Sequence, residues 1–201
     1  MHVNSAICNQ VFNESISLYH VLDNVDQIRP KSYDPGELKA LLFNKNWIDT
    51  VQWHLEDEIR DPEIEPSKAL IIKRRIDESN QQRTDIVELL DHFLSIELKD
   101  VLPAENATIN TETPAWAIDR LSILALKIYH MKEASLRQDV LQKHRLECQL
   151  KLEVLQQQQK DLSLAIDQLL SDLYSGKKIL KLYKQMKMYN DPELNPVLYK
   201  S

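Results

Sequence analysis

The sequence has very little glycine and cysteine, and few aromatic residues, for its length. Its 201 residues contain two glycines, two cysteines and 6% aromatic residues. Two glycines exclude a glycine-rich loop that would cradle phosphate groups, because such a loop needs several residues without side chains. Cys8 and Cys148 are too few and too far apart for a disulfide scaffold or a cysteine zinc site. We therefore predict that both cysteines are reduced thiols.

The chain also lacks long apolar runs and a basic charge balance. No apolar run reaches the length of about 18 residues that a transmembrane helix needs. The opening residues, MHVNSAICNQ, have no charged segment followed by an apolar one, which argues against a signal peptide. The formal net charge is -6, whereas general nucleic-acid binders are usually basic. We predict a cytoplasmic protein that has no transmembrane segment and binds no nucleic acid.

Helical apolar spacing dominates the remainder of the sequence. It predicts four long helices: one over about 34–61, one from Ser67 through Leu94, one from Pro114 to a turn near Ser135, and one over about 136–175. Asp34, Ser67 and Thr113 are the expected N-terminal caps, and Gly176 is the expected stop. Short helices are predicted at about 14–23 and, in a Lys-rich segment, at 177–188.

Long helices with mostly short connections are typical of bundles. We therefore predict an all-α fold, an antiparallel bundle of four long helices with short terminal helices. A single domain should span 1–201, with an N-terminal segment at 1–33, the bundle at 34–175 and the Lys-rich helix and tail at 176–201. No cofactor is expected.

The segment 136–175 would form a helix about 58 Å long, against about 32 Å for the helix before it. Its leucines lie near heptad spacing, which is typical of a coiled coil, and its overhanging part contains Gln156–Gln159. Two interpretations stay open for this overhang. Either it forms a homodimer, or the C-terminal tail covers it.

A polar stretch interrupts the second long helix. The nine residues from Asp77 to Asp85 include no apolar side chain. Because a helix turns about 100° per residue, this stretch covers every face, including the one toward the bundle. If the first two long helices form a hairpin about Ile64, Asn80–Thr84 lies level with about Lys45–Ile48. The stretch would then belong to a polar layer inside the bundle.

We predict that this layer binds an anionic small molecule, such as a nucleotide or a sugar phosphate. Arginine offers a planar fork to phosphate, and tryptophan a stacking surface. The predicted ligand-binding residues are Asn46, Trp47, Thr50, His54, Arg74, Asp77, Asn80, Arg83, Thr84 and Lys127. His130 and His144 are candidate catalytic residues, because histidine titrates near neutral pH. The alternative is a structural layer in which Arg83 pairs with Asp49 or Glu147.

A carboxylate motif occurs twice and raises a third alternative, a metal-dependent phosphohydrolase. Glu58 and Asp61, and likewise Glu88 and Asp91, form E-x-x-D pairs. Similar pairs hold magnesium in all-α nucleotide pyrophosphohydrolases, since carboxylates one turn apart share a helix face. In the hairpin, however, Glu58 lies about 9 Å and Glu88 about 36 Å from the turn. That separation argues against a shared ion, and we expect no metal site.

Four stretches carry a resemblance to a known family: NWIDTVQWHLEDEIRDP (46–62), RRIDESNQQRTDIVELLD (74–91), AIDRLSILALKIYHM (117–131) and MYNDPELNPVLY (188–199). Together they resemble the domain-of-unknown-function family 4254, over nearly the whole chain. The resemblance implies a helical cytoplasmic protein of bacteria, loosely associated with cell-envelope sugar genes. It supplies no catalytic residues. A further alternative for the function is a structural or interaction module that uses the overhanging part of 136–175 to dimerise or to dock an envelope-assembly enzyme.

Overall fold

The structure, a computed structural model, describes residues 2–186 and 191–199. It is all-α, as predicted, apart from two short strands. The elements in chain order are α1 (Ser5–Tyr19), α2 (Leu38–Glu58), α3 (Pro66–Glu97), β1 (Thr108–Ile109), α4 (Pro114–Leu136), α5 (Gln142–Tyr174), β2 (Lys178–Ile179) and α6 (Pro196–Tyr199).

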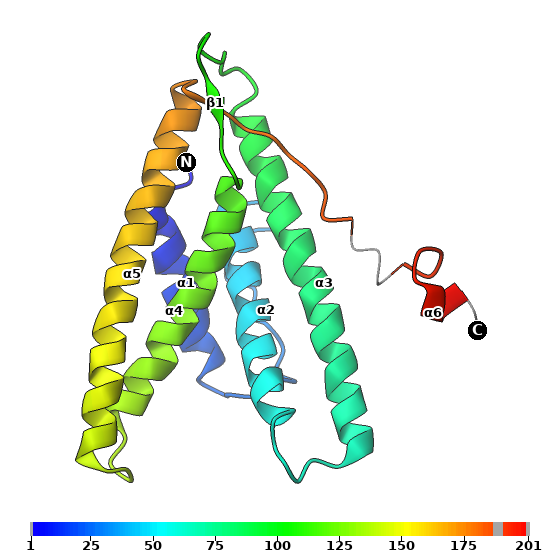
Figure 1. The fold of residues 1–201 in the computed structure, drawn as a ribbon, viewed down its shortest axis with the longest axis vertical. Helices are drawn as coiled ribbons and strands as arrows, with labels where there is room; N and C mark the ends of the chain where they lie inside the picture. Colours follow the sequence, from blue (N-terminus) through cyan, green and yellow to red (C-terminus); the bar gives the residue numbers. More distant parts are fainter. Residues whose placement is uncertain (1, 187–190, 200–201) are drawn as a thin grey trace.

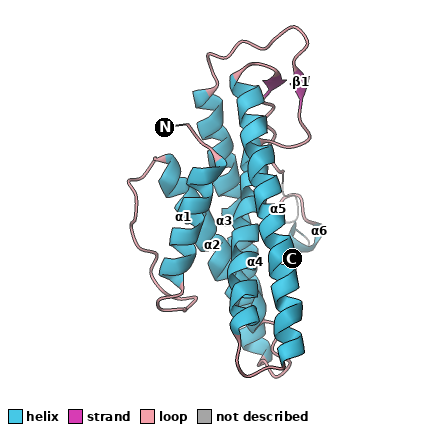
Figure 2. Cartoon of the chain, turned by 90° about the vertical axis from the view of Figure 1, so that its left-hand side faces the viewer, coloured by secondary structure: helices cyan, strands magenta, loops and turns pink. Residues whose placement is uncertain are grey.

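The four long helices form two antiparallel hairpins. Figure 1 shows α2 beside α3 on one side of the molecule and α4 beside α5 on the other. Helix α1 completes the bundle, because it contacts α2, α4 and α5 (Figure 2). None of the described helices combines the length and the apolar composition that a membrane span requires.

Helix α1 differs from the short helix predicted at 14–23. It begins at Ser5 because the side chain of Asn4 accepts a hydrogen bond from the Ile7 amide at 2.9 Å. Val11, Phe12 and Ile16 follow at helical spacing and are buried in the core. Helix α1 is therefore a full member of the bundle rather than a peripheral segment.

Two of the three predicted N-terminal caps are wrong. Helix α2 begins after Glu37 rather than at Asp34, and Glu37 makes no side-chain capping bond. Helix α3 is capped by Glu65 instead of Ser67, through a bond from the Lys68 amide at 2.9 Å. Thr113 caps α4 as predicted.

The Lys-rich segment is not a helix where it is described. Residues 178–179 form β2, which pairs in parallel with β1, and residues 180–186 continue without helical structure. The Thr108 amide donates to the Lys177 carbonyl at 3.1 Å. The chain after Gly176 therefore lies beside the segment that connects α3 to α4. Residues 187 and 188 of the predicted helix lie outside the described residues.

The last long helix is shorter than predicted, since α4 extends to Leu136 and α5 begins at Gln142. Part of its overhang contacts α1. The Ser5 hydroxyl donates to Asp167 at 2.6 Å, and Gln159 donates to Asn9 at 2.9 Å. The Gln-rich run, for which a homodimer contact and a covering tail were the two interpretations, therefore meets α1 at its last residue.

We predict that Gly176→Ala lowers the free energy of unfolding by about 2–3 kcal/mol. Gly176 ends α5 at a φ of +71°, and an added Cβ would lie 2.5 Å from the Leu102 carbonyl oxygen. Gly36→Ala is the matched control, since Gly36 also has a positive φ but open space around it. Urea denaturation of both variants measures the difference. Equal losses would show that the close approach to Leu102 costs nothing.

Candidate functional site

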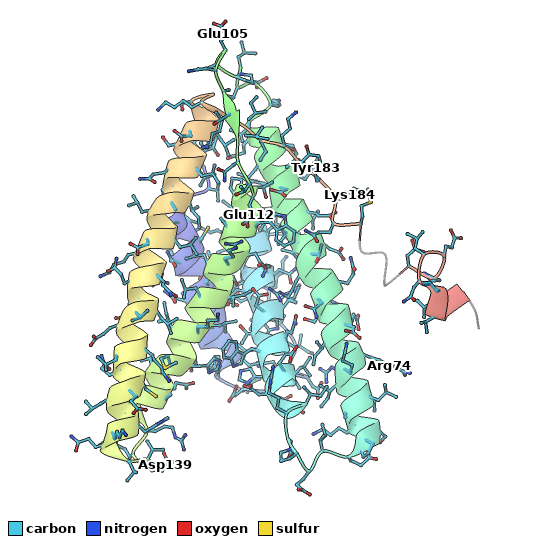
Figure 3. The ribbon with its side chains drawn as sticks, viewed as in Figure 1. Arg74, Glu105, Glu112, Asp139, Tyr183 and Lys184 are labelled. Carbon is cyan, nitrogen blue, oxygen red and sulfur yellow. The ribbon has the colours of Figure 1, made fainter. Side chains whose placement is uncertain are left out.

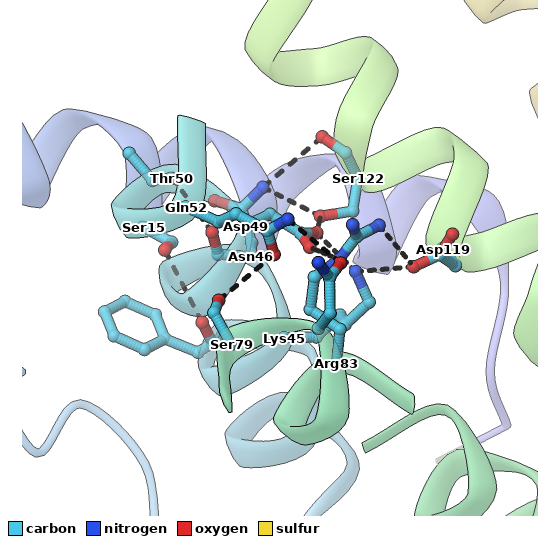
Figure 4. A network of polar contacts seen from close by, with 12 residues as sticks. Ser15, Lys45, Asn46, Asp49, Thr50, Gln52, Ser79, Arg83, Asp119 and Ser122 are labelled. Atoms are coloured by element: carbon cyan, nitrogen blue, oxygen red, sulfur yellow. Dashed lines mark hydrogen bonds and ion pairs between the residues drawn. The ribbon is translucent and has the colours of Figure 1, made fainter. Parts of the chain in front are cut away.

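A network of buried charges joins three helices at the middle of the bundle (Figure 4). Helix α2 contributes Lys45 and Asp49, α3 contributes Arg83, and α4 contributes Asp119 and Ser122. Lys45 is fully buried and Asp49 is 4% exposed. Charges this deep are stable only when oppositely charged groups surround them.

The contacts in this network pair each cation with both carboxylates. Lys45 binds Asp49 and reaches Asp119 with 2.7 Å between nitrogen and oxygen. The Arg83 Nε lies 2.6 Å from Asp49, and its Nη2 lies 3.2 Å from Asp119. Two positive and two negative side chains therefore form a closed, neutral set, which we call the charge network.

Hydrogen bonds complete the charge network. The Ser122 hydroxyl donates to the Asp49 carboxylate at 2.6 Å. The side-chain amide of Asn46 donates to the Ser122 hydroxyl at 3.0 Å. Burial lowers the pKa of Arg83, but Asp49 and Asp119 outweigh that effect and raise it above the usual value. Arg83 is accordingly a fixed cation whose fork already binds carboxylates.

Several predicted ligand residues lie in or beside this layer, but their polar groups form hydrogen bonds with one another. The Thr50 hydroxyl donates to the Asn46 carbonyl, and the Thr84 hydroxyl to the Asn80 carbonyl. Gln52, which was not among the predicted residues, donates to the Asn80 side chain at 3.0 Å and thereby connects α2 to α3. These residues form a polar contact between the two helices.

The remaining predicted residues do not join the layer. Arg74, Asp77 and Lys127 are exposed, and Asp77 pairs with Lys73 on the surface of α3. Figure 3 shows Arg74 pointing away from the bundle. Trp47 is buried in the core between the rings of Tyr19 and Phe43.

A cavity of about 330 Å³ opens beside the charge network, between α2, α3 and α4. Trp53, Ile123 and Leu126 form its apolar wall. Its charged lining consists of Asp49, Glu56, Asp57, Arg60 and Arg83. The predicted residue Arg83 therefore lines a concave space, although its guanidinium group already binds Asp49 and Asp119.

A second polar cluster lies at the end of α1. His54 on α2 and His130 on α4 meet His20, which follows the last residue of α1. One ring nitrogen from each residue lies within 4.8 Å of the others, and this is the one group of metal-ligating residues that the described part of the chain brings together. His54 and His130 were both predicted members of the polar layer, whereas His20 was not predicted to belong to any site.

The other candidate residues are scattered. His144 is exposed on α5, where its Nε2 lies 3.5 Å from Cys148 Sγ. Glu58 pairs with Lys68, while the Asp61 side chain accepts from the Glu63 amide in the turn. The four E-x-x-D carboxylates are not part of the metal-ligating group found among the described residues.

Glu88 and Asp91 lie at the other end of α3. Glu88 accepts a hydrogen bond from the Gln185 amide. Burial raises the pKa of Asp91 to about 6, although a hydrogen bond with Thr113 opposes this shift. Glu58 and Asp61 thus lie at the turn between α2 and α3, whereas Glu88 and Asp91 lie in the last third of α3.

A match to a protein-family model identifies the family of the chain. The model for "Protein of unknown function (DUF4254)" matches residues 39–182. The chain belongs to the DUF4254 family. The DUF4254 match includes the whole charge network, His54 and His130, whereas His20 precedes it. No curated protein and no solved structure matches the chain.

We predict that Lys45→Met lowers the free energy of unfolding by about 3–5 kcal/mol, because it leaves two buried carboxylates to a single arginine. Lys73→Met is the control, since it breaks only the exposed pair with Asp77 and should cost less than about 1 kcal/mol. Chemical denaturation at neutral pH measures both values. Similar small losses in the two variants would contradict a stabilising role for the buried charge.

Proposed function

We propose that the protein binds a small polar molecule in the cavity beside the charge network. The observation that carries this proposal is the cavity itself, which combines a tryptophan wall with five charged side chains. Its volume of about 330 Å³ falls in the range typical of ligand pockets. A mostly apolar concave surface with a few convergent polar groups is the usual form of such sites.

The charge of the lining indicates which ligands fit. Asp49 and Arg83 neutralise each other within the charge network, and Arg60 pairs with Glu56 at 3.1 Å. Among the described residues, no lysine or arginine forms an ion pair with Asp57, which leaves one carboxylate uncompensated at the cavity. We therefore propose a neutral or positively charged ligand whose hydroxyl or amino groups reach Asp57.

This proposal modifies the anionic ligand expected from the sequence. That expectation assumed a free arginine fork, whereas the fork of Arg83 is held by Asp49 and Asp119. An anion would also meet Glu56 and Asp57 at the cavity rim. A ring-shaped molecule with one apolar face would pack on Trp53, since aromatic side chains offer large apolar surfaces. A role in cell-envelope sugar metabolism stays an expectation from the family resemblance.

The charge network supports this site by fixing its floor. Arg83 and Asp49 both line the cavity and are each held by at least two partners. Side chains fixed before binding lose little conformational entropy when a ligand arrives. The closed network is therefore compatible with ligand binding, because it positions groups rather than supplying free charge.

Three sugars of equal ring size and different charge test the proposal: glucosamine, glucose and glucose 6-phosphate. We predict that glucosamine shifts the Trp53 indole N–H signal in a proton–nitrogen NMR spectrum. Its affinity should exceed that of glucose 6-phosphate about tenfold, or about 1.4 kcal/mol. Asp57→Asn should reduce this preference, whereas Asp85→Asn, an exposed change on α3, should leave it unchanged.

Two results would contradict the proposal. If none of the three sugars shifts the Trp53 signal, the cavity is not a site for ring-shaped polar molecules. If glucose 6-phosphate binds most tightly, the anionic class expected from the sequence is correct and the arginines dominate recognition.

A second candidate function, an interaction module, is favoured by the outer face of α5. Leu146, Leu150 and Val154 follow one another at one-turn spacing and are 58%, 63% and 57% exposed. Residues four apart share a helix face, so these side chains form one apolar row. We propose a homodimer in which this row packs against its copy in a coiled-coil-like contact, because exposed apolar patches mark association sites.

We predict that Leu150→Glu converts such a dimer to a monomer, since it places two carboxylates at the centre of the contact. Analytical ultracentrifugation of the wild type and the variant measures the change. Leu102→Glu is the control, because Leu102 is an exposed leucine outside α5, 88% exposed against 63% for Leu150. A monomeric wild type at all concentrations would eliminate this candidate.

A further inference from the structure

Three histidines from distant parts of the chain present ring nitrogens to one point. His20 caps the end of α1, His54 lies on α2 and His130 lies on α4. The three ring centroids are 5.3 to 5.4 Å apart, and each pair of rings is steeply inclined rather than stacked. We call this group the histidine triad.

The spacing within the triad suits a tetrahedral metal. Zinc–nitrogen bonds of about 2.0–2.1 Å at tetrahedral angles place two ligand nitrogens about 3.4 Å apart. The Nε2 atoms of His20 and His54 are 3.3 Å apart. All three histidines offer a ligand atom within 4.8 Å of the others, so small side-chain rotations bring the third nitrogen to bonding distance.

The opposite ring nitrogens are held in the manner of metal ligands. The His20 Nδ1 lies 2.7 Å from the Ile16 carbonyl, and the His130 Nδ1 lies 3.2 Å from the Glu133 carboxylate. Each of these partners is an acceptor, so it favours a proton on Nδ1 and leaves the Nε2 lone pair available. A carbonyl or carboxylate behind the ring is the usual support of a metal-bound histidine.

A hydrogen bond alone does not account for the cluster. His54 can donate to His20 through the two Nε2 atoms, which satisfies those two residues. The His130 Nε2, however, is buried and has no hydrogen-bond partner among the described residues. Leaving a buried acceptor unpaired costs free energy. A metal ion would satisfy all three nitrogens at once.

Surrounding aromatic rings fix the orientation of the triad. Trp53 stacks on His130 at 4.9 Å, Tyr19 stacks on His54 at 5.1 Å, and Tyr129 lies against His20 at 4.2 Å. Ligands held by packing and hydrogen bonds before the ion arrives form a preorganised site. The site therefore needs little rearrangement to bind a metal.

Burial and three nearby carboxylates have opposite effects on the histidine triad. Burial, together with the neighbouring histidines, lowers the pKa of His54 and of His130. Asp23, Asp57 and Glu133 act on His54 from the loop after α1, from α2 and from α4. These carboxylates give the site a negative potential.

Asp23 lies beside two of the three histidines, although it is not in the group whose ligand atoms all lie within 4.8 Å of one another. Its Oδ1 lies 3.5 Å from the His54 Nε2 and 4.0 Å from the His20 Nε2. Its backbone adopts a φ of 47°, a left-handed conformation that few residues except glycine, asparagine and aspartate adopt readily. This turn directs the carboxylate back toward the end of α1, beside His20.

We propose that His20, His54 and His130 bind one divalent transition-metal ion of the zinc class, with Asp23 as the fourth ligand. Imidazole ligands suit zinc, copper and nickel, whereas magnesium and calcium require oxygen ligands. The ion would join the end of α1 to α2 and α4. This site adjoins the proposed ligand cavity, because Trp53 lines the cavity and stacks on His130. Its ligand residues are different ones, and neither proposal depends on the other.

Calorimetric titration of Zn²⁺ into the full-length, metal-free protein, purified without a histidine tag, tests the proposal. We predict one bound equivalent of submicromolar affinity and no detectable binding of Mg²⁺. Co²⁺ used in place of Zn²⁺ should give the intense visible absorption of a tetrahedral site. His130→Gln should weaken Zn²⁺ binding by about 100-fold or more, since even supporting residues contribute about 10–100-fold.

Two further variants locate the site. Asp23→Asn should weaken Zn²⁺ binding about tenfold or more, and His92→Gln, an exposed change on α3, should leave it unchanged. Circular dichroism and urea denaturation in the presence of a chelator should show that the metal-free His130→Gln and wild-type proteins are equally folded. Such agreement separates loss of a ligand from loss of the fold.

Three outcomes would overturn the assignment in whole or in part. Absence of Zn²⁺ binding by the wild type, or unchanged affinity in His130→Gln, would show that the triad is not a metal site. Unchanged affinity in Asp23→Asn would remove Asp23 from the ligands.

Discussion

The pairing of Lys45 with two aspartates is the interaction on which the middle of the bundle depends. A fully buried ammonium group is tolerated only when its charge is balanced within contact distance. Asp49, one turn further along α2, provides half of that balance, and Asp119 on α4 provides the other half. Arg83 then balances the second carboxylate from α3. Because each charge needs its partners, the three helices are held at one relative height.

That fixed height has consequences on both sides of the charge network. Toward the cavity, it presents Arg83 and Asp49 as an immobile floor below Trp53. Toward the end of α1, it sets the register of α2 against α4, and this register brings His54 level with His130. A shift of α4 by one residue along its axis would move the His130 ring by about 1.5 Å and around the helix by about 100°. The geometry of both candidate sites therefore follows from one set of ion pairs.

The sequence predicted the helical architecture, because apolar spacing over long segments is a strong local signal. It also located the polar layer, since nine consecutive polar residues at Asp77–Asp85 must include some that face inward. It also named one partner, since the structural alternative paired Arg83 with Asp49, as the structure has it, but it did not indicate Asp119 or Ser122. Asp119 and Ser122 lie in the most apolar of the long helices. A polar residue in such a helix can indicate a buried polar contact, but it does not say which residue is the partner. The role of His20 was not predictable, because positions 20, 54 and 130 have no motif spacing and converge only through tertiary packing.

The charge network also bears on the order in which the chain folds. Lys45 and Asp49 are four residues apart and can meet as soon as α2 forms, but the bond from Ser122 to Asp49 spans 73 residues. Closing so long a segment costs chain entropy, which favours prior formation of the α2–α3 hairpin. The buried ions are therefore desolvated only when α4 arrives, late along the folding route. Interactions that form after the rate-limiting barrier act chiefly on unfolding. The charge network should accordingly extend the lifetime of the folded molecule more than it hastens its formation.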